Sequence, residues 1–379
     1  MSRPLRVVHV ITSLTTGGAE RQLELLVARS ANETATIALY AGGPVADSMR
    51  RSGQRVDVLG LSGWRRFATP FVLASRLRAY RPDVVHVHLL SAQLWGIPAA
   101  RLAGTPVVVS TEHSLMDDTI EGRPHTWWLR LLYRGLERMT TRTVAVSETT
   151  SERLQRWGVD ADRITVSDNG IDFDGLAFDN AARWRVRREL DINDDTVVVG
   201  AVGRLDKVKR LDTVVRACAP LLHAGRVLVV AGTGPLGPQL RQLGEELGVS
   251  GSIRWLGARD DVSDVLSATD VLVSASGDET FGMAVVEGVA NGLPVVYVQC
   301  PALEELSTEI PSATRLPAPT TSSADAEALR AAVESVASRL RRWPVPTALV
   351  ERYGADAAAA RVDDVHAVLV AEGSGRGTG

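Results

Sequence analysis

The feature that most constrains the fold is a repeated alternation of short β-branched runs with longer amphipathic stretches. In the first half the runs lie near residues 5–11, 34–40, 55–60, 83–88, 106–110 and 142–147. In the second half they recur near 196–202, 226–231, 252–256, 270–275 and 294–298. Short strands that alternate with helices form parallel sheets through right-handed βαβ connections. The pattern therefore predicts an α/β protein with two Rossmann-like domains that face a central cleft.

The chain has 379 residues, which suffices for two domains of ordinary size. We place the first domain at 1–170 and the second at 196–345, with a linker over 171–195 where Asp, Asn and Gly interrupt the pattern. An Ala- and Val-rich stretch over 346–372 predicts a closing helix. The Gly- and Ser-rich end, 373–379, predicts a disordered tail.

Composition and charge exclude several classes of protein. The two cysteines cannot build a disulfide framework or a cysteine-based zinc site, and they fit a reducing cytoplasm. We expect neither a signal peptide nor a membrane span, because the N-terminus leads directly into a strand and no apolar run approaches ~20 residues. Residues 1–170 carry 21 Arg against 16 acidic residues, which favours an anionic partner. Nucleic acid is not expected, since no basic stripe is interleaved with aromatic residues.

The chain has two lysines, Lys207 and Lys209, and both follow the strand predicted over 196–202. All other Lys or Arg positions of the chain are arginines. This segment therefore keeps the compact ammonium of lysine in a chain whose composition strongly favours arginine. Ligands bind at the carboxyl ends of such strands. We interpret the segment as an anion site for phosphate, with a solvated turn as the alternative.

A second segment with chemistry is Gly277-Asp278-Glu279-Thr280-Phe281-Gly282-Met283, which follows the run 270–275 and leads into a helix containing Glu287. Glu279 is expected in the loop at the carboxyl end of the strand, and Glu287 two turns into the helix. The backbone N–H groups of Phe281, Gly282 and Met283 are expected at the start of the helix, where they can bind oxygen atoms. The alternative is a helix with an acidic cap.

These residues are similar in spacing and order to glycosyltransferase family 4. Glu279 and Glu287, followed by Gly292-Leu293-Pro294-Val295-Val296, resemble the family's Glu-x7-Glu signature. Five other segments resemble further family motifs in the same order: Gly17-Gly18-Ala19-Glu20, Asn169-Gly170-Ile171-Asp172, Gly203-Arg204 with Lys209, Ala231-Gly232-Thr233-Gly234-Pro235, and Leu256-Gly257. In one respect the chain departs from the family. Residues 297–305 lack the usual Gly-Gly turn, so we assign no donor contact there.

The resemblance implies a bacterial, retaining hexosyltransferase of the GT-B fold, with an acceptor-binding first domain and a nucleotide-sugar-binding second domain. It implies that Gly17 and Gly18 approach a phosphate, and that Arg204 and Lys209 neutralise the departing diphosphate. Glu279 is implied beside the donor sugar and Glu287 on the ribose hydroxyls. Because cations can stabilise the leaving group, we expect neither a metal ion nor a cofactor.

Histidines add three candidates. His113, which follows the run 106–110, resembles the family's first-domain histidine that faces the donor sugar, and we expect it to act through hydrogen bonds or as a general base. His86 and His88 lie two apart on a strand and so share one face. A metal site was the alternative for this pair, but no third ligand is evident in the sequence, so a place in the core or lining the cleft is favoured.

Two further motifs match patterns of other protein classes, but their positions in the chain do not favour those classes. Residues 232–237 satisfy the G-x-G-x-x-G pattern of dinucleotide sites, but they follow the second strand of their domain, where that fingerprint belongs on the first. Asp172-Phe173-Asp174 is a D-x-D triplet, which in another transferase fold binds a metal diphosphate. It lies beside the expected linker, and such triplets are common by chance.

Two segments rich in arginine and large apolar residues, 64–81 and 123–138, favour peripheral contact with an anionic membrane on its inner face. The alternative is a core helix with a solvated arginine face.

The sequence thus predicts transfer of a sugar from a nucleotide-diphosphate sugar to a sugar, lipid or small-molecule acceptor. UDP is the favoured nucleotide, with GDP and TDP as alternatives. Polysaccharide, glycolipid or natural-product biosynthesis are the expected settings. A GT-B-fold nucleotide-sugar epimerase and a non-catalytic nucleotide-sugar-binding protein remain as alternative functions.

Overall fold

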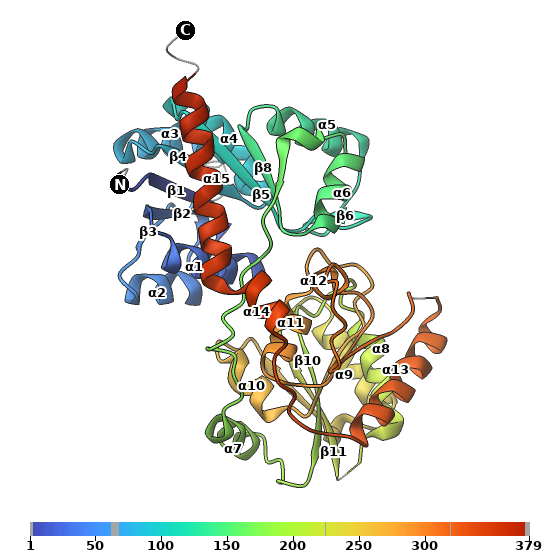
Figure 1. Ribbon diagram of the computed structural model, residues 1–379. Coiled ribbons are helices and arrows are strands. Elements are labelled where there is room, and N and C mark those ends of the chain that lie inside the picture. Colours follow the sequence, from blue (N-terminus) through green and yellow to red (C-terminus); the bar gives the residue numbers. More distant parts are fainter. Residues whose placement is uncertain (1–2, 62–67, 224, 319, 376–379) are drawn as a thin grey trace. The chain divides into compact units, whose positions relative to one another are not determined.

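The computed structural model of the chain describes residues 3–61, 68–223, 225–318 and 320–375. The chain forms two compact units, one made of Met1–Gly170 with Arg352–Gly379 and the other of Ile171–Glu351. Each unit is built on a parallel sheet covered by helices (Figure 1), which confirms the predicted α/β class with two Rossmann-like units.

The sheet of unit 1 has the strand order β3-β2-β1-β4-β5-β8-β9 among the described residues, and all its pairs are parallel. Its strands are β1 (Arg6–Ser13), β2 (Glu33–Ala41), β3 (Arg55–Val58), β4 (Val84–His88), β5 (Val107–Glu112), β8 (Arg142–Ala145) and β9 (Ile164–Val166). Its helices are α1 (Gly18–Arg29), α2 (Pro44–Arg51), α3 (Thr69–Tyr80), α4 (Leu90–Ala103), α5 (Trp127–Glu137), α6 (Glu148–Arg156), the short η2 (Ala161–Arg163) and α15 (Ala355–Gly375). A two-stranded antiparallel ribbon pairs β6 (Thr119–Ile120) with β7 (Arg123–Pro124).

The central strands are buried on both faces, so their side chains alternate between two cores. On one face Val8, Val10 and Val85 pack against α3 and α4. On the other face Val7 and Val84 pack against Leu369 of α15. Figure 1 shows α15, in red, beside α1 within this unit.

The end of the chain differs from the single closing helix predicted over 346–372. Two helices occupy it, α14 (Thr347–Tyr353) and α15, and α15 continues through residues 373–375, which were predicted as disordered. Residues 376–379 lie outside the described part of the chain. Leu369 of α15 is buried against the sheet, so packing of its apolar face stabilises this helix.

Gly170 ends the first segment of unit 1, and its backbone is held by Gln22 of α1. The Gln22 amide donates to the Gly170 carbonyl at 2.7 Å, and the Gly170 N–H donates to Gln22 Oε1 at 2.9 Å. A Cβ atom at position 170 would lie 2.7 Å from Leu25 and 3.0 Å from Ala358. The Asn-Gly motif is therefore explained by close packing of the backbone against α1 and α15.

The sheet of unit 2 has the order β12-β11-β10-β13-β14-β15, again with parallel pairs throughout the described residues. Its strands are β10 (Val197–Val202), β11 (Arg226–Ala231), β12 (Ile253–Gly257), β13 (Val271–Ser274), β14 (Val295–Tyr297) and β15 (Ala313–Arg315). Its helices are α7 (Asn180–Glu189), α8 (Leu211–Cys218), α9 (Gly237–Glu246), α10 (Val262–Ala268), α11 (Met283–Ala290), α12 (Pro301–Glu304) and α13 (Ser322–Ala337), with the short η3 (Ala219–Leu221) and η4 (Ser250–Ser252).

The segment predicted as a linker, 171–195, contains α7 and is part of unit 2. Arg187 of α7 is buried, and its guanidinium pairs with Asp270 at 2.6 Å, while Arg183 pairs with the other oxygen of the same carboxylate at 2.7 Å. A buried guanidinium is stable only with such partners. These two ion pairs fix α7 to the residue that precedes β13.

None of the described helices is long and apolar enough to cross a membrane.

Candidate active site

The loops that follow β10 and β13 carry the candidate residues of unit 2. The two strands are neighbours in the sheet, with Val199 opposite Val271 and Gly200 opposite Leu272. Because parallel strands end at the same edge, the segment after β10 and the segment after β13 meet there. This sheet order brings together two motifs about 70 residues apart.

The contact between these loops is an ion pair. Lys209 Nζ lies 2.6 Å from Glu279 Oε1, with side chains that are 26% and 9% exposed. The Ser276 hydroxyl donates to the carbonyl of Val208 at 3.1 Å, and the Lys209 N–H donates to Asp206 Oδ1 at 3.2 Å. The ammonium is thus held at a defined place beside a carboxylate that is nearly buried.

Arg204 lies in the same loop as Lys209 but has a different partner. Its guanidinium pairs with Asp206 at 2.5 Å, and the side chain is 64% exposed. Lys207 is also exposed. The structure therefore brings Lys209, but not Lys207, to the carboxylate that the sequence singled out.

Gly282 and Phe281 join the loop to α11, which begins at Met283. Gly282 has a φ of +92°, and a Cβ atom there would lie 2.5 Å from Cys300 Sγ, so only glycine fits this turn. Phe281 is buried, which makes its side chain a core residue and leaves only its backbone for binding. Glu287 lies on the second turn of α11 and is half-buried.

The loop after β14 contributes a residue that sequence reasoning missed. Gln299 accepts a hydrogen bond from the Glu279 N–H at 2.9 Å. The feature that could have identified Gln299 is its position just after β14, a strand that neighbours β13. Next to it, burial raises the pKa of the Cys300 thiol well above its usual range, so this thiol is not a nucleophile at neutral pH.

Gly232 and Gly234 allow the loop after β11 to pack closely on the loop after β10. Gly232 has a φ of +146°, and a Cβ atom there would lie 1.8 Å from the Gly203 carbonyl oxygen. The Leu205 N–H donates to the Thr233 carbonyl at 2.9 Å. These glycines let the segment after β11 pack against the loop that carries Arg204. This packing explains the G-x-G-x-x-G pattern, so no dinucleotide site is needed to account for it.

The glycine pair of unit 1 lies at the start of α1, where Gly17 is the N-cap and Gly18 the first helical residue. The Glu20 carboxylate lies over Gly17: a Cβ atom at that position would be 2.3 Å from Glu20 Oε2. A Cβ atom at Gly18 would meet no described atom within 4 Å. The helix start is thus open beside Gly18.

His113 follows β5 and is half-buried. Its Nε2 lies 3.2 Å from Nδ1 of His88. Burial lowers the pKa of His113 to about 4, so its imidazole is neutral at physiological pH.

The residue before His113, Glu112, accepts a hydrogen bond from the Tyr133 hydroxyl at 3.0 Å, and burial raises the pKa of Glu112 to about 7. His86 and His88 are fully buried, so the expectation that they line a cleft is not met.

Two family models match the chain. The one described as Glycosyltransferase Family 4 matches residues 16–174, and the one described as Glycosyl transferases group 1 matches residues 182–340. The chain belongs to glycosyltransferase family 4. Together these two models match one segment in each unit of this family 4 chain.

Curated relatives of this family 4 chain include two proteins named D-inositol 3-phosphate glycosyltransferase. That of Stackebrandtia nassauensis is 33% identical over 56% of this chain and 52% of its own length. That of Corynebacterium efficiens is 28% identical over 77% of this chain and 64% of its own length. The chain thus spans about half to two thirds of the length of these relatives.

Solved structures share the fold at low identity. Anabaena HepE in complex with UDP and glucose is 18% identical, with a TM-score of 0.81 over 96% of this chain and 100% of that chain. Sucrose-phosphate synthase from Thermosynechococcus elongatus is 17% identical, with a TM-score of 0.76 over 97% of this chain and 100% of that one. The likeness shows the GT-B fold.

Proposed function

We propose that this chain is a retaining glycosyltransferase that moves a sugar from a nucleotide-diphosphate sugar to a hydroxyl acceptor without a catalytic metal ion. The observation that carries the proposal is the ion pair of Lys209 with Glu279 at the ends of β10 and β13. Membership of family 4 supports it. So does the fold shared with Anabaena HepE, whose solved complexes contain UDP or UDP-glucose, and we propose a UDP-sugar as the donor.

The leaving group needs positive charge. As the bond between the sugar and the diphosphate breaks, negative charge grows on the bridging oxygen, and a fixed cation stabilises it most where water is excluded. The Lys209 ammonium has three N–H donors. It can therefore keep its contact with Glu279 while it donates to a phosphate, and Arg204 supplies a second cation from the same loop.

The sugar needs oriented acceptors for its hydroxyls. We assign this role to Glu279, whose carboxylate is fixed on one side by Lys209 and whose backbone is fixed by Gln299. Glu287 of α11 accepts from the ribose hydroxyls. The acceptor hydroxyl attacks from the face that the diphosphate leaves, and a departing phosphate oxygen takes its proton, which retains the configuration.

His113 acts in this proposal as a hydrogen-bonding group. Its pKa of about 4 makes it a poor general base at neutral pH, because the best catalytic pKa lies near the working pH. A neutral imidazole both donates and accepts, which suits a sugar hydroxyl.

The acceptor in this proposal carries phosphate. Residues 1–170 hold 21 Arg against 16 acidic residues, which favours an anionic ligand in the acceptor domain. The curated relatives, named for D-inositol 3-phosphate, point the same way. A phosphorylated polyol and a lipid-linked phosphate both present this chemistry.

The donor experiment is a thermal-shift and product screen across UDP-, GDP- and TDP-sugars, with phosphorylated polyols and lipid phosphates as acceptors. We expect a UDP-sugar to raise the unfolding temperature and to give a glycoside whose anomeric configuration, read by NMR, equals that of the donor.

Other outcomes of this screen point elsewhere. Solvent deuterium that enters the sugar in the absence of acceptor indicates an epimerase. Donor binding with neither hydrolysis nor transfer indicates a non-catalytic binding protein. An inverted anomeric configuration contradicts the retaining mechanism.

Membrane contact is the other part of the proposal. On α5, Trp127, Trp128 and Leu131 are 79%, 53% and 60% exposed, although the opposite side of the helix is buried. Arg130 of this helix is exposed, and its guanidinium donates to the backbone carbonyls of Trp157 and Arg156. Phe71 of α3 is exposed as well, and Trp64 through Phe67 lie outside the described residues.

The double variant Trp127→Ser with Leu131→Ser is expected to weaken binding to phosphatidylglycerol vesicles by at least about tenfold, since each side chain contributes ~1.5–3 kcal/mol when its apolar surface is buried. Vesicle co-sedimentation measures this. Val368→Ser, which removes an exposed apolar side chain from α15, is the matched control. Equal binding by the double variant and the control contradicts membrane contact through α5.

A further inference from the structure

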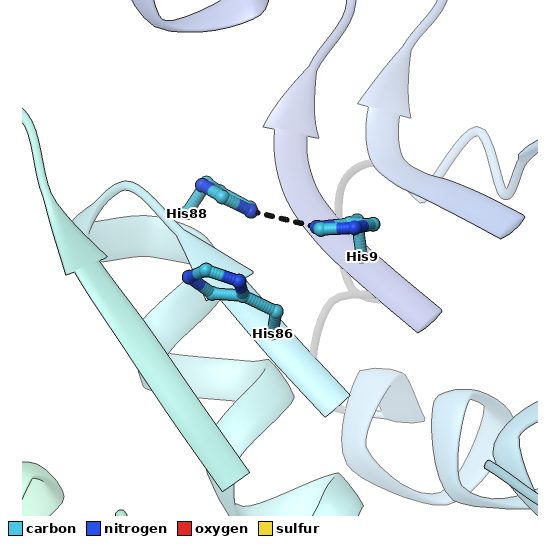
Figure 2. Close-up of side chains that lie close together, drawn as sticks. All are labelled: His9, His86 and His88. Carbon is cyan, nitrogen blue, oxygen red and sulfur yellow. Dashed lines mark hydrogen bonds between the residues drawn. The ribbon is translucent and has the colours of Figure 1, made fainter. Parts of the chain in front are cut away.

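Five histidines from distant parts of the chain converge in unit 1. His9 lies on β1, His86 and His88 on β4, His113 after β5 and His366 on α15. In the sheet His9 is opposite His86, and Ile11 is opposite His88, so the three strand histidines point to one face. Figure 2 shows His9, His86 and His88 with their rings close together.

The ring nitrogens are close enough to share an ion. His9 Nδ1 lies 3.1 Å from His88 Nε2, the contact dashed in Figure 2. His86 Nδ1 lies 3.0 Å from His366 Nε2. One ligand atom from each of His9, His86 and His88 lies within 4.8 Å of the other two. Two imidazole nitrogens on one tetrahedral Zn²⁺, each bonded at ~2.0–2.1 Å, lie about 3.3 Å apart.

An apolar core does not require these side chains. Val7 and Val84 lie two residues before His9 and His86 on the same face of the sheet. They form a pair of the same kind and pack against Leu369. Burying a polar ring costs free energy unless its nitrogens are satisfied. His366 Nδ1 is nonetheless buried with no partner among the described residues. A run of valines would continue the core at lower cost, so the cluster needs another explanation.

The three rings of His9, His86 and His88 are buried, and burial disfavours the charged imidazolium form. The neutral imidazole is the form that coordinates metals.

We propose that His9, His86 and His88 bind a divalent transition-metal ion of the Zn²⁺ class. Sets made of imidazole alone suit Zn²⁺, Co²⁺, Ni²⁺ or Cu²⁺, whereas Mg²⁺, Ca²⁺ and Mn²⁺ favour oxygen ligands. His9 coordinates through Nδ1 and His88 through Nε2. The Thr111 hydroxyl lies 2.6 Å from His86 Nε2, which leaves Nδ1 of His86 for the ion.

The outer contacts fit such a centre. Histidine ligands use their second nitrogen to contact a partner that fixes the ring. Thr111 takes this role for His86, and His113 takes it for His88 at 3.2 Å. An ion on His88 Nε2 requires the proton of that ring on Nδ1, which donates to His113 Nε2 and places the proton of His113 on Nδ1. The ion therefore sets the tautomer of His113.

The proposal rests on the geometry of unit 1 and does not depend on the proposed transfer reaction. The pair formed by Lys209 and Glu279 belongs to unit 2, and the leaving-group chemistry assigned to it involves no metal. Loss of metal binding and loss of transfer are thus separate results.

The test uses the full chain without an affinity tag, expressed in minimal medium supplemented with Zn²⁺ or Co²⁺ and purified without chelator. Elemental analysis is expected to give about one ion per chain, and the Co²⁺ form is expected to show the visible absorption of a four-coordinate site that includes three imidazole nitrogens. His9→Asn and His88→Gln keep a polar side chain but remove a ligand, and each is expected to lower the bound fraction at least tenfold. His223→Gln, at an exposed histidine of unit 2, is the matched control and retains the ion.

Two results overturn the proposal. One is wild-type protein that carries no more Zn²⁺ or Co²⁺ than His9→Asn. The other is Co²⁺ protein that lacks the absorption of nitrogen ligation. Should a variant fail to fold, the wild-type Co²⁺ spectrum and the ¹⁵N shifts of its histidine rings, which differ between metal-bound and hydrogen-bonded nitrogens, still decide the question.

Discussion

Replacing Lys209 by alanine is expected to lower the rate of glycosyl transfer by about 10²–10³-fold, the usual effect of removing one preorganised electrostatic group. The ammonium lies 2.6 Å from Glu279 and is mostly shielded from water, so solvent screens its attraction to the leaving diphosphate less than at an exposed site. The loss is expected in kcat more than in KM, because negative charge on the bridging oxygen grows only in the transition state. Steady-state kinetics with a UDP-sugar measures it.

The chain itself offers the matched control, since its only other lysine lies two residues away. Lys207 is exposed, and Lys207→Ala is expected to keep activity within about twofold. Equal losses in the two alanine variants contradict the role assigned to Lys209.

Folding and catalysis are separated by a double variant. Lys209→Ala alone leaves the nearly buried Glu279 carboxylate without its ammonium partner, which costs stability. In Lys209→Met with Glu279→Gln both charges are removed, so the unfolding temperature is expected to recover while activity does not. Recovery of activity together with stability indicates that the pair is structural.

Replacing Gly232 by alanine is expected to destabilise unit 2 by about 3 kcal/mol or more. The φ of +146° is strained for any residue with a Cβ, and that atom would lie 1.8 Å from the Gly203 carbonyl oxygen. To relieve the clash, the loop after β11 must move away from the loop that carries Arg204. Urea unfolding followed by circular dichroism measures the change in the free energy of unfolding.

Two other glycines of the same motif allow the expected loss of stability to be compared between positions. A Cβ at Gly234 would lie 2.4 Å from the Leu205 carbonyl oxygen, so Gly234→Ala is expected to destabilise the unit as well. A Cβ at Gly237, the first residue of α9, meets only ordinary contact at 3.5 Å. Gly237→Ala is therefore expected to lie within about 1 kcal/mol of the wild type. Similar losses at 232 and 237 contradict the interlocked loops.

Much of the fold was predictable because its signal is local. The run of valines over β10 and the run 226–231 alternate with helical stretches, and each predicted strand lies within a few residues of an observed one. The short β9 and β15 were missed, since three residues carry little periodicity. The helix α7 was missed because it is held by the ion pairs of Arg183 and Arg187 with Asp270, and a sequence pattern cannot show that contact.

The candidate site was partly predictable. The sequence predicted three of its residues. Glu279 and Glu287 were indicated by their spacing, and Lys209 by its place after a strand. Gln299 was passed over because the loop that holds it departs from the family pattern, although its position after β14 places it at the same sheet edge.

The sequence by itself determined the alternating elements, the two units built from them and the segments that carry chemistry, because these follow from the order of apolar and polar residues along the chain. Only the tertiary structure decided which distant residues meet. Lys209 reaches Glu279 because β10 lies beside β13, and His9 reaches His88 because β1 lies beside β4. Strand order in a sheet is set by the packing of helices on its two faces, and local periodicity does not encode it.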